Sequence, residues 1–425
     1  MREVKVFQIG LGSFGRHGFE KFIDMQNHLP EADVEFVGVA DTDREKLDSA
    51  ESFAKTHGLE IEVFKTAGKM YQRAEKIKDG ETEVLIYDAG PTQSHSDHIY
   101  ESVHRGFYHL SEKPSSMTRQ EHIREKKLAM DRDVTWMVDF IERENPAVKK
   151  TLDIIEEESV EKIEVFRESS IGLQKLYNPV KRAGVKGGDI LDKMTHEVYV
   201  LDFLEKINDD YSLELVSAEA EVFMPKDFNS DKFMTTQGGY TDKIKDNTAT
   251  GMTHTLFDSD GVKVELNSSW LGLSEEAMHH ARGLREKVGE ELLERDFVEQ
   301  ENEAFLDEEA RFFVITGSRN LLGDMLHGRL YDLDTGEEIE TYDLTHDQLY
   351  RVLENAVLEA AGITENPVSE KETDVFMTAI FDVRDKVTSD VDSFEELEGA
   401  RDKIESLVIR DGKILENEEA ETIAG

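Results

Sequence analysis

Two short stretches of the sequence carry residue types and spacings that could do chemistry on a bound ligand. The first, Gly10–Gly15 (GLGSFG), follows the apolar run Val4–Ile9. Three glycines at this spacing let the backbone turn sharply, approach a pyrophosphate and pack a helix against a strand. The second, Asp192–His196, lies in a long helical pattern, where residues four apart share one face. By spacing alone such a pair is more often a surface helix pair; if it acts on a bound ligand, His196 is the base because imidazole titrates near neutral pH.

A second apolar run, Phe36–Ala40, ends directly before Asp41. An acid at the end of the second strand is placed to bond both hydroxyls of an adenosine ribose, which favours NAD over NADP. Arg44 follows closely and weakens that preference. The alternative is a glycine-rich turn without a ligand, which the strand–turn–helix context of Gly10–Gly15 disfavours.

The elements that must position these residues alternate between strand and helix from residue 1 to 140. This rhythm predicts a Rossmann-type, doubly wound parallel sheet, an α/β fold with helices on both faces. The expected strands are Val4–Ile9, Glu35–Ala40, Ile61–Phe64, Val84–Tyr87, Phe107–Leu110 and Val134–Phe140.

After residue 140 the rhythm changes to long strand patterns without regular helical crossovers. We therefore expect residues 141–387 to form an α+β domain with a mostly antiparallel open sheet. One helix is predicted over Gly188–Lys206, and a helical insertion over about 275–309. Residues 388–425 form an acidic C-terminal extension, and Pro225–Asp246 reads as a loop.

Composition excludes several classes of protein. The chain has 93 Asp and Glu against 50 Lys and Arg, a net charge of −43, which repels nucleic acid and anionic membranes. We interpret this surface as suited to high salt, with an ordinary acidic protein as the alternative. No cysteine is present, so thiolate metal sites are excluded and no metal is expected. No apolar run approaches the ~20 residues of a membrane span, and no signal-peptide pattern opens the chain, so we expect a cytoplasmic protein.

Four further segments resemble one family of oxidoreductases. They are residues 86–95 (IYDAGPTQSH), 111–114 (SEKP), 142–148 (ERENPAV) and 187–196 (GGDILDKMTH). In this order they resemble the Gfo/Idh/MocA family, named for glucose-fructose oxidoreductase and inositol dehydrogenase. Two departures stand out: Asp189 replaces a common third glycine, and Tyr199 replaces a common second aspartate.

The resemblance implies an NAD-dependent oxidoreductase that moves a hydride between a nicotinamide and a secondary hydroxyl of a sugar, sugar phosphate, nucleotide sugar or cyclitol. It implies that Lys113 contacts the reacting hydroxyl and the nicotinamide ribose, with Asp192 and His196 as its catalytic partners. A homo-oligomer, dimer or tetramer, is expected by analogy. The residues expected at the cofactor are Gly10, Gly12, Ser13, Phe14, Gly15, Asp41, Arg44, Pro91, His95, Glu112 and Lys113.

The substrate has one further clue, an acid-free and basic stretch over Ser169–Gly188 directly before Asp192. In so acidic a chain, a basic loop predicts an anionic substrate, with pairing of these bases to surface acids as the alternative. The residues expected at the substrate are Lys113, Tyr177, Lys181, Arg182, Asp192 and His196. The alternative function is a catalytically silent member of the fold that binds cofactor as a sensor or regulator.

Overall fold

The computed structural model describes residues 3–132, 134–169, 188–223, 250–269, 273–289, 292–300, 303–342, 347–364, 370–388, 406–410 and 413–415. Its internal contacts divide the chain into two units. Unit 1 comprises Met1–Glu144 and Leu344–Asp374, and unit 2 comprises Asn145–Asp343 and Val375–Gly425. Across these described ranges, no helix has the length and apolar character needed to cross a membrane.

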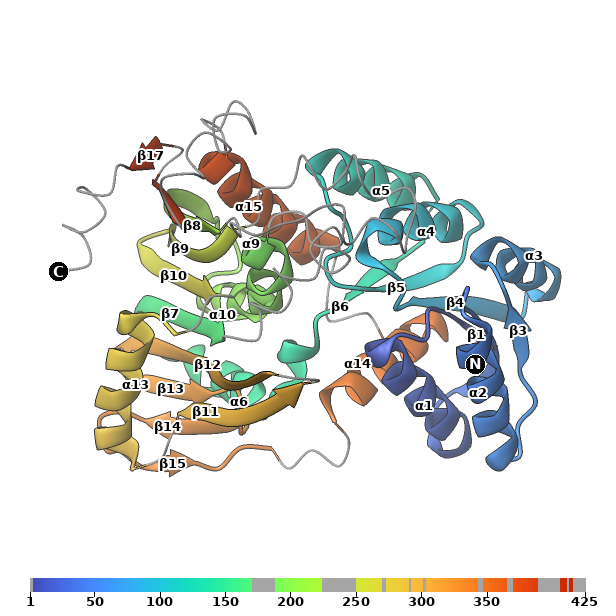
Figure 1. The fold of residues 1–425 in the computed structure, drawn as a ribbon, viewed down its shortest axis with the longest axis horizontal. Helices are drawn as coiled ribbons and strands as arrows, with labels where there is room; N and C mark the ends of the chain where they lie inside the picture. Colours follow the sequence, from blue (N-terminus) through green and yellow to red (C-terminus); the bar gives the residue numbers. More distant parts are fainter. Residues whose placement is uncertain are drawn as a thin grey trace. The chain divides into compact units, whose positions relative to one another are not determined.

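Unit 1 is built on a six-stranded parallel sheet with the order β3-β2-β1-β4-β5-β6 (Figure 1). Its strands are β1 (Glu3–Ile9), β2 (Asp33–Ala40), β3 (Glu62–Phe64), β4 (Thr82–Asp88), β5 (Tyr108–Glu112) and β6 (Trp136–Asp139). Its helices are α1 (Ser13–His28), α2 (Arg44–Thr56), α3 (Ala67–Ile77), α4 (Thr92–His104), α5 (Arg119–Arg132), the short η1 (Ile141–Glu144) and α14 (Gln348–Ala360). This order is the predicted doubly wound arrangement, whose strand order reverses between β1 and β4.

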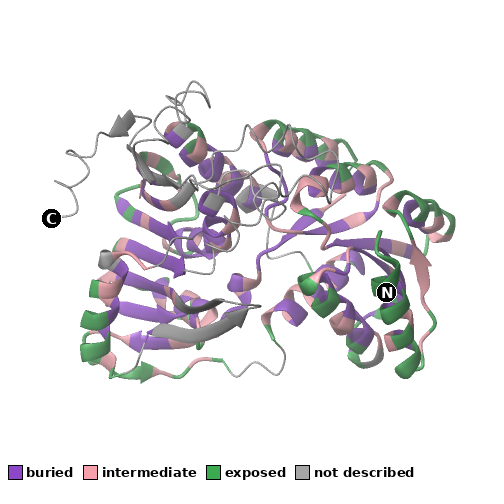
Figure 2. Cartoon of the chain, viewed as in Figure 1, coloured by how far each residue is buried: buried purple, intermediate pink, exposed green. Residues whose placement is uncertain are grey.

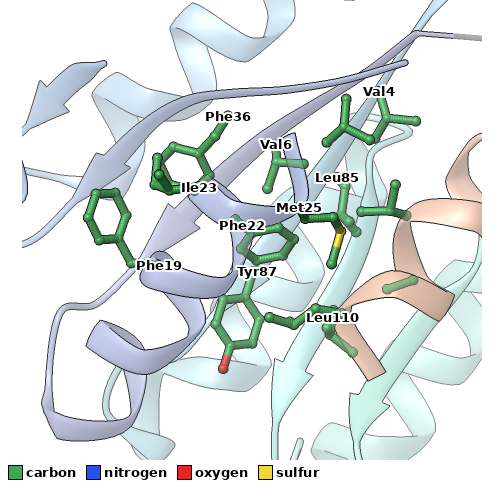
Figure 3. Packing of buried hydrophobic residues seen from close by; sticks show 14 of the residues in the cluster. Val4, Val6, Phe19, Phe22, Ile23, Met25, Phe36, Leu85, Tyr87 and Leu110 are labelled. Carbon is green, nitrogen blue, oxygen red and sulfur yellow. The ribbon is translucent and has the colours of Figure 1, made fainter. Parts of the chain in front are cut away.

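The core of unit 1 explains why the central strands are continuous apolar runs. β1 and β4 are buried nearly throughout because helices cover both faces of the sheet (Figure 2). On the face covered by α1, Phe22 stacks edge-on against Tyr87 with ring centroids 5.7 Å apart (Figure 3). α14 adds Leu353, which is fully buried, to this same cluster. A helix more than 200 residues downstream thus completes the N-terminal core.

Unit 2 contains an 11-stranded sheet in the described residues, with the order β15-β14-β13-β12-β7-β10-β9-β8-β16-β17 and β11 paired with β12. Among the described pairs, β7 and β10 run parallel and the others run antiparallel, as the sequence predicts for this domain. The strands are β7 (Val160–Ser169), β8 (Glu214–Phe223), β9 (Thr250–Ser259), β10 (Val262–Ser269), β11 (Leu293–Gln300), β12 (Glu303–Gly317), β13 (Leu321–Asp324), β14 (Arg329–Asp332), β15 (Glu338–Ile339), β16 (Ser406–Arg410) and β17 (Lys413–Leu415). The helices are α6 (Pro146–Ile155), α9 (Gly188–Asp192), the 3-10 segment η2 (Met194–Val198), α10 (Tyr199–Ile207), α13 (Glu275–Val288) and α15 (Glu370–Thr388), which begins within unit 1.

The helical insertion expected over 275–309 is helical only in its first part. α13 begins after Ser274, whose side chain accepts from the backbone N–H of Ala277, and ends at Gly289 in the left-handed conformation. The rest of the insertion forms β11 and the first half of β12, which pair antiparallel. Strand pairing overrides the helix propensity of this charged segment. The predicted loop Pro225–Asp246 lies outside the described residues.

The place of α14 leads to a stability prediction for unit 1. Leu353→Ala removes a fully buried side chain and should destabilise unit 1 by about 2–5 kcal/mol. The sequence has two tryptophans, Trp136 and Trp270, and Trp136 is buried in β6. In a Trp270→Phe background, Trp136 fluorescence reports urea unfolding of unit 1. Leu330→Ala in β14 is the matched control, because it empties the same volume in unit 2; an unmoved Trp136 midpoint in the Leu353 variant would contradict the assignment.

Candidate cofactor and acid–base site

The glycine-rich turn after β1 has the geometry of a close backbone approach. Gly10 adopts φ +87°, a left-handed conformation, and a Cβ there would lie 2.5 Å from the carbonyl oxygen of Ala89. A Cβ at Gly15 would lie 2.5 Å from the carbonyl oxygen of Gly10, so α1 packs directly on the turn. A Cβ at Gly12 would meet nothing within 4 Å. The middle glycine therefore faces open space beside the start of α1, where a pyrophosphate fits.

Gln8 holds this turn in shape, and the sequence analysis did not single it out. It is fully buried, and its Nε2 donates to the carbonyl oxygens of Gly10, at 2.8 Å, and Gly15, at 2.5 Å. One side chain therefore ties both ends of the glycine-rich stretch to β1. A polar residue inside the apolar run Val4–Ile9 is the signal that could have found it, because buried amides need partners.

Asp41, at the end of β2, binds the backbone on two sides. Its Oδ2 accepts from the N–H of Leu11 at 2.7 Å, and its Oδ1 accepts from the N–H of Asp43 at 2.8 Å. Lys46 Nζ lies 3.9 Å from Oδ2, and the Asp41 side chain is 10% exposed. Two carboxylate oxygens offer about four acceptor sites, so acceptor capacity remains for ribose hydroxyls.

A cavity of about 420 Å³ opens beside the turn, between α1 and α2. It is lined by Leu11, Gly12, Ser13, Arg16, Phe19, Glu20, Asp43, Glu45, Lys46, Ser49, Ala50 and Phe53. Phe14 is not among them and is 39% exposed. Arg44, expected at the cofactor, forms an exposed ion pair with Asp48 at 2.6 Å, and its cofactor role stays a prediction. Lys46 is thus the cation of this cavity nearest Asp41.

His95 connects two of the turns at the ends of β4 and β5. It is 1% exposed; its Nδ1 lies 2.9 Å from the carbonyl oxygen of Pro114 and its Nε2 lies 3.0 Å from that of Gly90. Pro91 is exposed and precedes the first residue of α4. Because both ring nitrogens of His95 face backbone carbonyls, its evident role in the structure is to fix the segment that carries Lys113.

A second buried histidine network lies below this segment. Asp88 is fully buried and accepts from the N–H of Gly90 at 2.9 Å and from Nδ1 of His98 at 2.8 Å. Burial opposes the charge of Asp88, but nearby His95 and the bond from His98 outweigh it and hold the pKa of Asp88 below its usual range. His109 is also fully buried, and burial lowers the pKa of its imidazole to about 3. His95 and His109 are therefore both part of the buried core of unit 1.

Glu112 is the last residue of β5 and Lys113 follows it at the carboxyl edge of the sheet. Glu112 is half-buried and accepts from the Tyr87 hydroxyl at 3.1 Å. It pairs in register with Asp139, the last residue of β6. Asp139 is 1% exposed, and both burial and the Glu112 charge raise its pKa well above the usual range. Asp139 was not among the residues predicted from the sequence for this site.

In unit 2, the predicted helix over Gly188–Lys206 is broken. α9 ends at Asp192, the chain turns at Lys193, and η2 carries His196 on a 3-10 segment. Residues four apart lie on one face only in a continuous α-helix, so their spacing no longer places Asp192 and His196 on a common face. Both side chains are half-buried. Their joint action stays a prediction.

Buried polar pairs fasten these short helical segments to the sheet of unit 2. The pairs are Arg167 with Glu197, Lys193 with the Ser169 hydroxyl, and the Ser268 hydroxyl with Asp189 at 2.6 Å. All six residues are at most 8% exposed. Asp189, which departs from the family pattern, is thus a buried anchor to β10. Tyr199, the other departure, packs edge-on against Phe203 in the core.

The predicted site residues are distributed over both units. The glycine-rich turn, Asp41, His95 and Lys113 belong to unit 1, whereas Asp192 and His196 belong to unit 2. Tyr177, Lys181 and Arg182, expected at the substrate, lie outside the described residues. Their roles stay predictions.

Comparison with protein families agrees with the geometry of unit 1. The profile of the Gfo/Idh/MocA family, described as an oxidoreductase family with an NAD-binding Rossmann fold, matches residues 4–140. A sequence comparison with curated proteins finds no match. The matched range contains the glycine-rich turn, Asp41 and Lys113.

Solved structures share the fold over most of the chain. UDP-N-acetylglucosamine 3-dehydrogenase GnnA from Acidithiobacillus ferrooxidans superposes with a TM-score of 0.59 at 16% identity, covering 90% of this chain and 97% of that one. myo-Inositol 2-dehydrogenase from Lactobacillus plantarum gives 0.59 at 11% identity, covering 90% and 96%. The WlbA dehydrogenase from Chromobacterium violaceum, solved with NADH and UDP-GlcNAcA, gives 0.57 at 12% identity, covering 96% of each chain. At these identities the likeness concerns the fold.

His109 leads to a prediction about acid stability. Below about pH 6.5 an unfolded histidine binds a proton, whereas buried His109 stays neutral down to about 3. Unfolding therefore takes up a proton in this window, and unit 1 should lose stability as the pH falls through it. His109→Gln should flatten the slope of unfolding free energy by up to about 1.4 kcal/mol per pH unit.

The measurement is urea unfolding followed by Trp136 fluorescence between about pH 4.5 and 6.5. His17→Gln is the control, since His17 is exposed on α1 and should leave the slope unchanged. Glu125, whose pKa burial raises to about 7, opposes this trend in all three proteins and cancels in the comparison. Equal slopes for wild type and His109→Gln would contradict the assignment.

Proposed function

The chain belongs to the Gfo/Idh/MocA oxidoreductase family by its NAD-binding domain, and from this premise we propose that it is an NAD-dependent dehydrogenase of a sugar-type secondary alcohol. Its substrate is a nucleotide sugar, sugar phosphate, other sugar or cyclitol. The observation that carries the proposal is the turn at Gly10–Gly15, open at Gly12 and bonded to Asp41 at the end of β2. Such a turn supports a pyrophosphate held by backbone N–H groups, with its ribose at the acid.

The bound nicotinamide would accept a hydride at C4, and the chain's own residues would manage the charge and the proton. Lys113, at the end of β5, places its cation beside the substrate oxygen and stabilises the developing alkoxide. His196 takes the hydroxyl proton, and Asp192 holds the substrate or the imidazole. Oxidation of a secondary alcohol needs both groups, a proton acceptor and a positive charge next to the oxygen.

Two observations favour an anionic substrate within this class. The stretch Ser169–Gly188 contains four bases and no acid in a chain of net charge −43. In the comparisons, one neighbour is named as a UDP-N-acetylglucosamine dehydrogenase and another holds UDP-GlcNAcA. Lys181 and Arg182 are the side chains that we propose for the phosphate groups, Arg182 by bidentate bonding.

The proposal is tested by following nicotinamide absorbance with NAD and a panel of nucleotide sugars, sugar phosphates and inositols. Lys113→Ala should lower turnover by at least about 100-fold, because the variant lacks the charge beside the reacting oxygen. NADH binding, measured by fluorescence titration, should change little. Lys127→Ala, an exposed lysine on α5, is the matched control.

Near wild-type turnover of Lys113→Ala would remove this residue from the mechanism. His196→Ala should lower turnover and flatten its pH dependence. NADH binding without turnover of any panel member would favour the silent sensor over the enzyme.

Cofactor choice depends on Asp41. The 2′-phosphate of NADP would meet this carboxylate, so kcat/KM should favour NAD by about tenfold or more. Asp41→Ser should narrow the difference, because the variant lacks the like charge while keeping a hydroxyl for the Leu11 N–H. Asp48→Asn, an exposed aspartate on α2, is the control. A wild-type preference for NADP would overturn the assignment.

A further inference from the structure

We propose that Glu112 and Asp139 share one proton, so that the pair presents a single negative charge beside Lys113. The two residues end neighbouring parallel strands and are partners in register. Register partners in a parallel sheet project to the same face from strands about 4.8 Å apart. Their carboxyl groups are therefore held together by the sheet itself.

Asp139 is buried where a proton shared with Glu112 would give it a hydrogen bond that its other described neighbours do not provide. Asp139 is 1% exposed, and neither of its oxygens has a well-oriented hydrogen-bond donor among the described residues. Its polar neighbours are the Glu112 carboxyl, the Tyr87 hydroxyl and Lys113. The Tyr87 hydroxyl donates to Glu112. A proton between the carboxyls gives Asp139 a hydrogen bond and removes a buried like-charge repulsion.

The charged and titratable groups around the pair come from several elements. Those facing Glu112 are Asp139 from β6, Lys113 after β5, His95 from α4 and Tyr87 from β4. Burial raises the pKa of Glu112 and, together with the Glu112 charge, raises that of Asp139 further. The Lys113 cation lowers the pKa of both carboxyl groups, and one shared negative charge balances its positive charge.

The shared proton itself does not depend on the proposed function, but its effect on catalysis by Lys113 does. If Lys113 stabilises an alkoxide, its cation needs a counter-charge that does not also attract the substrate proton. A carboxyl pair with one charge provides that, and Asp139 acts through Glu112 as a positioning residue. A fully ionised pair would compete with the alkoxide for the ammonium group.

The decisive experiment is an infrared difference spectrum at pH 7, wild type minus Asp139→Asn. We expect the carbonyl stretch of a protonated carboxylic acid in wild type and its loss in the variant, which keeps the shape of the side chain. Asp88→Asn is the matched control, because Asp88 is a buried aspartate of the same sheet with its charge stabilised by His98. Its difference spectrum should show carboxylate bands without the protonated band.

Turnover gives a second readout if a substrate is found. Asp139→Asn should keep the pH profile of wild type, because it replaces a neutral acid by a neutral amide. Glu112→Gln removes the single charge, so it should lower turnover by about tenfold and move the alkaline limb to lower pH.

Each outcome bears on the proposal. Absence of the protonated band in wild type, or a shift of the pH profile by Asp139→Asn as large as that by Glu112→Gln, would overturn it. If Asp139→Asn does not fold, the wild-type minus Glu112→Gln spectrum answers the same question, since the shared band must then move or vanish. If no substrate is turned over, the proposed function fails while the infrared result still decides the shared proton.

Discussion

Close approach of α1 to the sheet is the constraint on which the rest of unit 1 depends. A Cβ at Gly15 would lie 2.5 Å from the Gly10 carbonyl oxygen, and one at Gly18 would lie 2.4 Å from the Tyr87 ring. The helix therefore rests on the turn and on Tyr87 at once. The Tyr87 hydroxyl, held beneath α1, donates to Glu112. The glycine-rich turn and the Glu112 carboxyl group next to Lys113 are thus both positioned by the packing of α1.

The core beneath this contact is assembled from both ends of the chain. β1, β4 and α1 form one side of the apolar cluster, and α14 supplies Leu349, Tyr350 and Leu353. Because α14 lies far downstream, the cofactor domain cannot close its core until the chain has passed through unit 2. The boundary predicted at residue 140 rests on the change from alternating strands and helices to long strands. The packed core of unit 1 also includes α14, which lies far beyond that boundary. Hydrophobic periodicity identifies the buried face of a helix but not which sheet it covers.

Sequence patterns predicted what local chemistry determines. The doubly wound parallel sheet and the glycine-rich turn followed from apolar runs and from Gly10–Gly15, because these signals lie within a few residues of each other. Features made by pairing of distant segments were missed. β11 has a charged, helix-forming sequence yet pairs with β12, and the break at Lys193 accompanies side-chain contacts to β7 that no periodicity encodes. Asp139 was missed for the same reason, because its register partner Glu112 lies on another strand.

The aspartates at the carboxyl edge of the parallel sheet show how this acidic chain satisfies its buried carboxyl groups. The chain has 93 Asp and Glu against 50 Lys and Arg. At the carboxyl edge of the parallel sheet, three aspartates find other donors: Asp41 takes two backbone N–H groups, and Asp88 takes the Gly90 N–H and His98. In our proposal Asp139 takes a shared proton. None of these hydrogen bonds involves Lys113, which in our proposed function acts on the substrate.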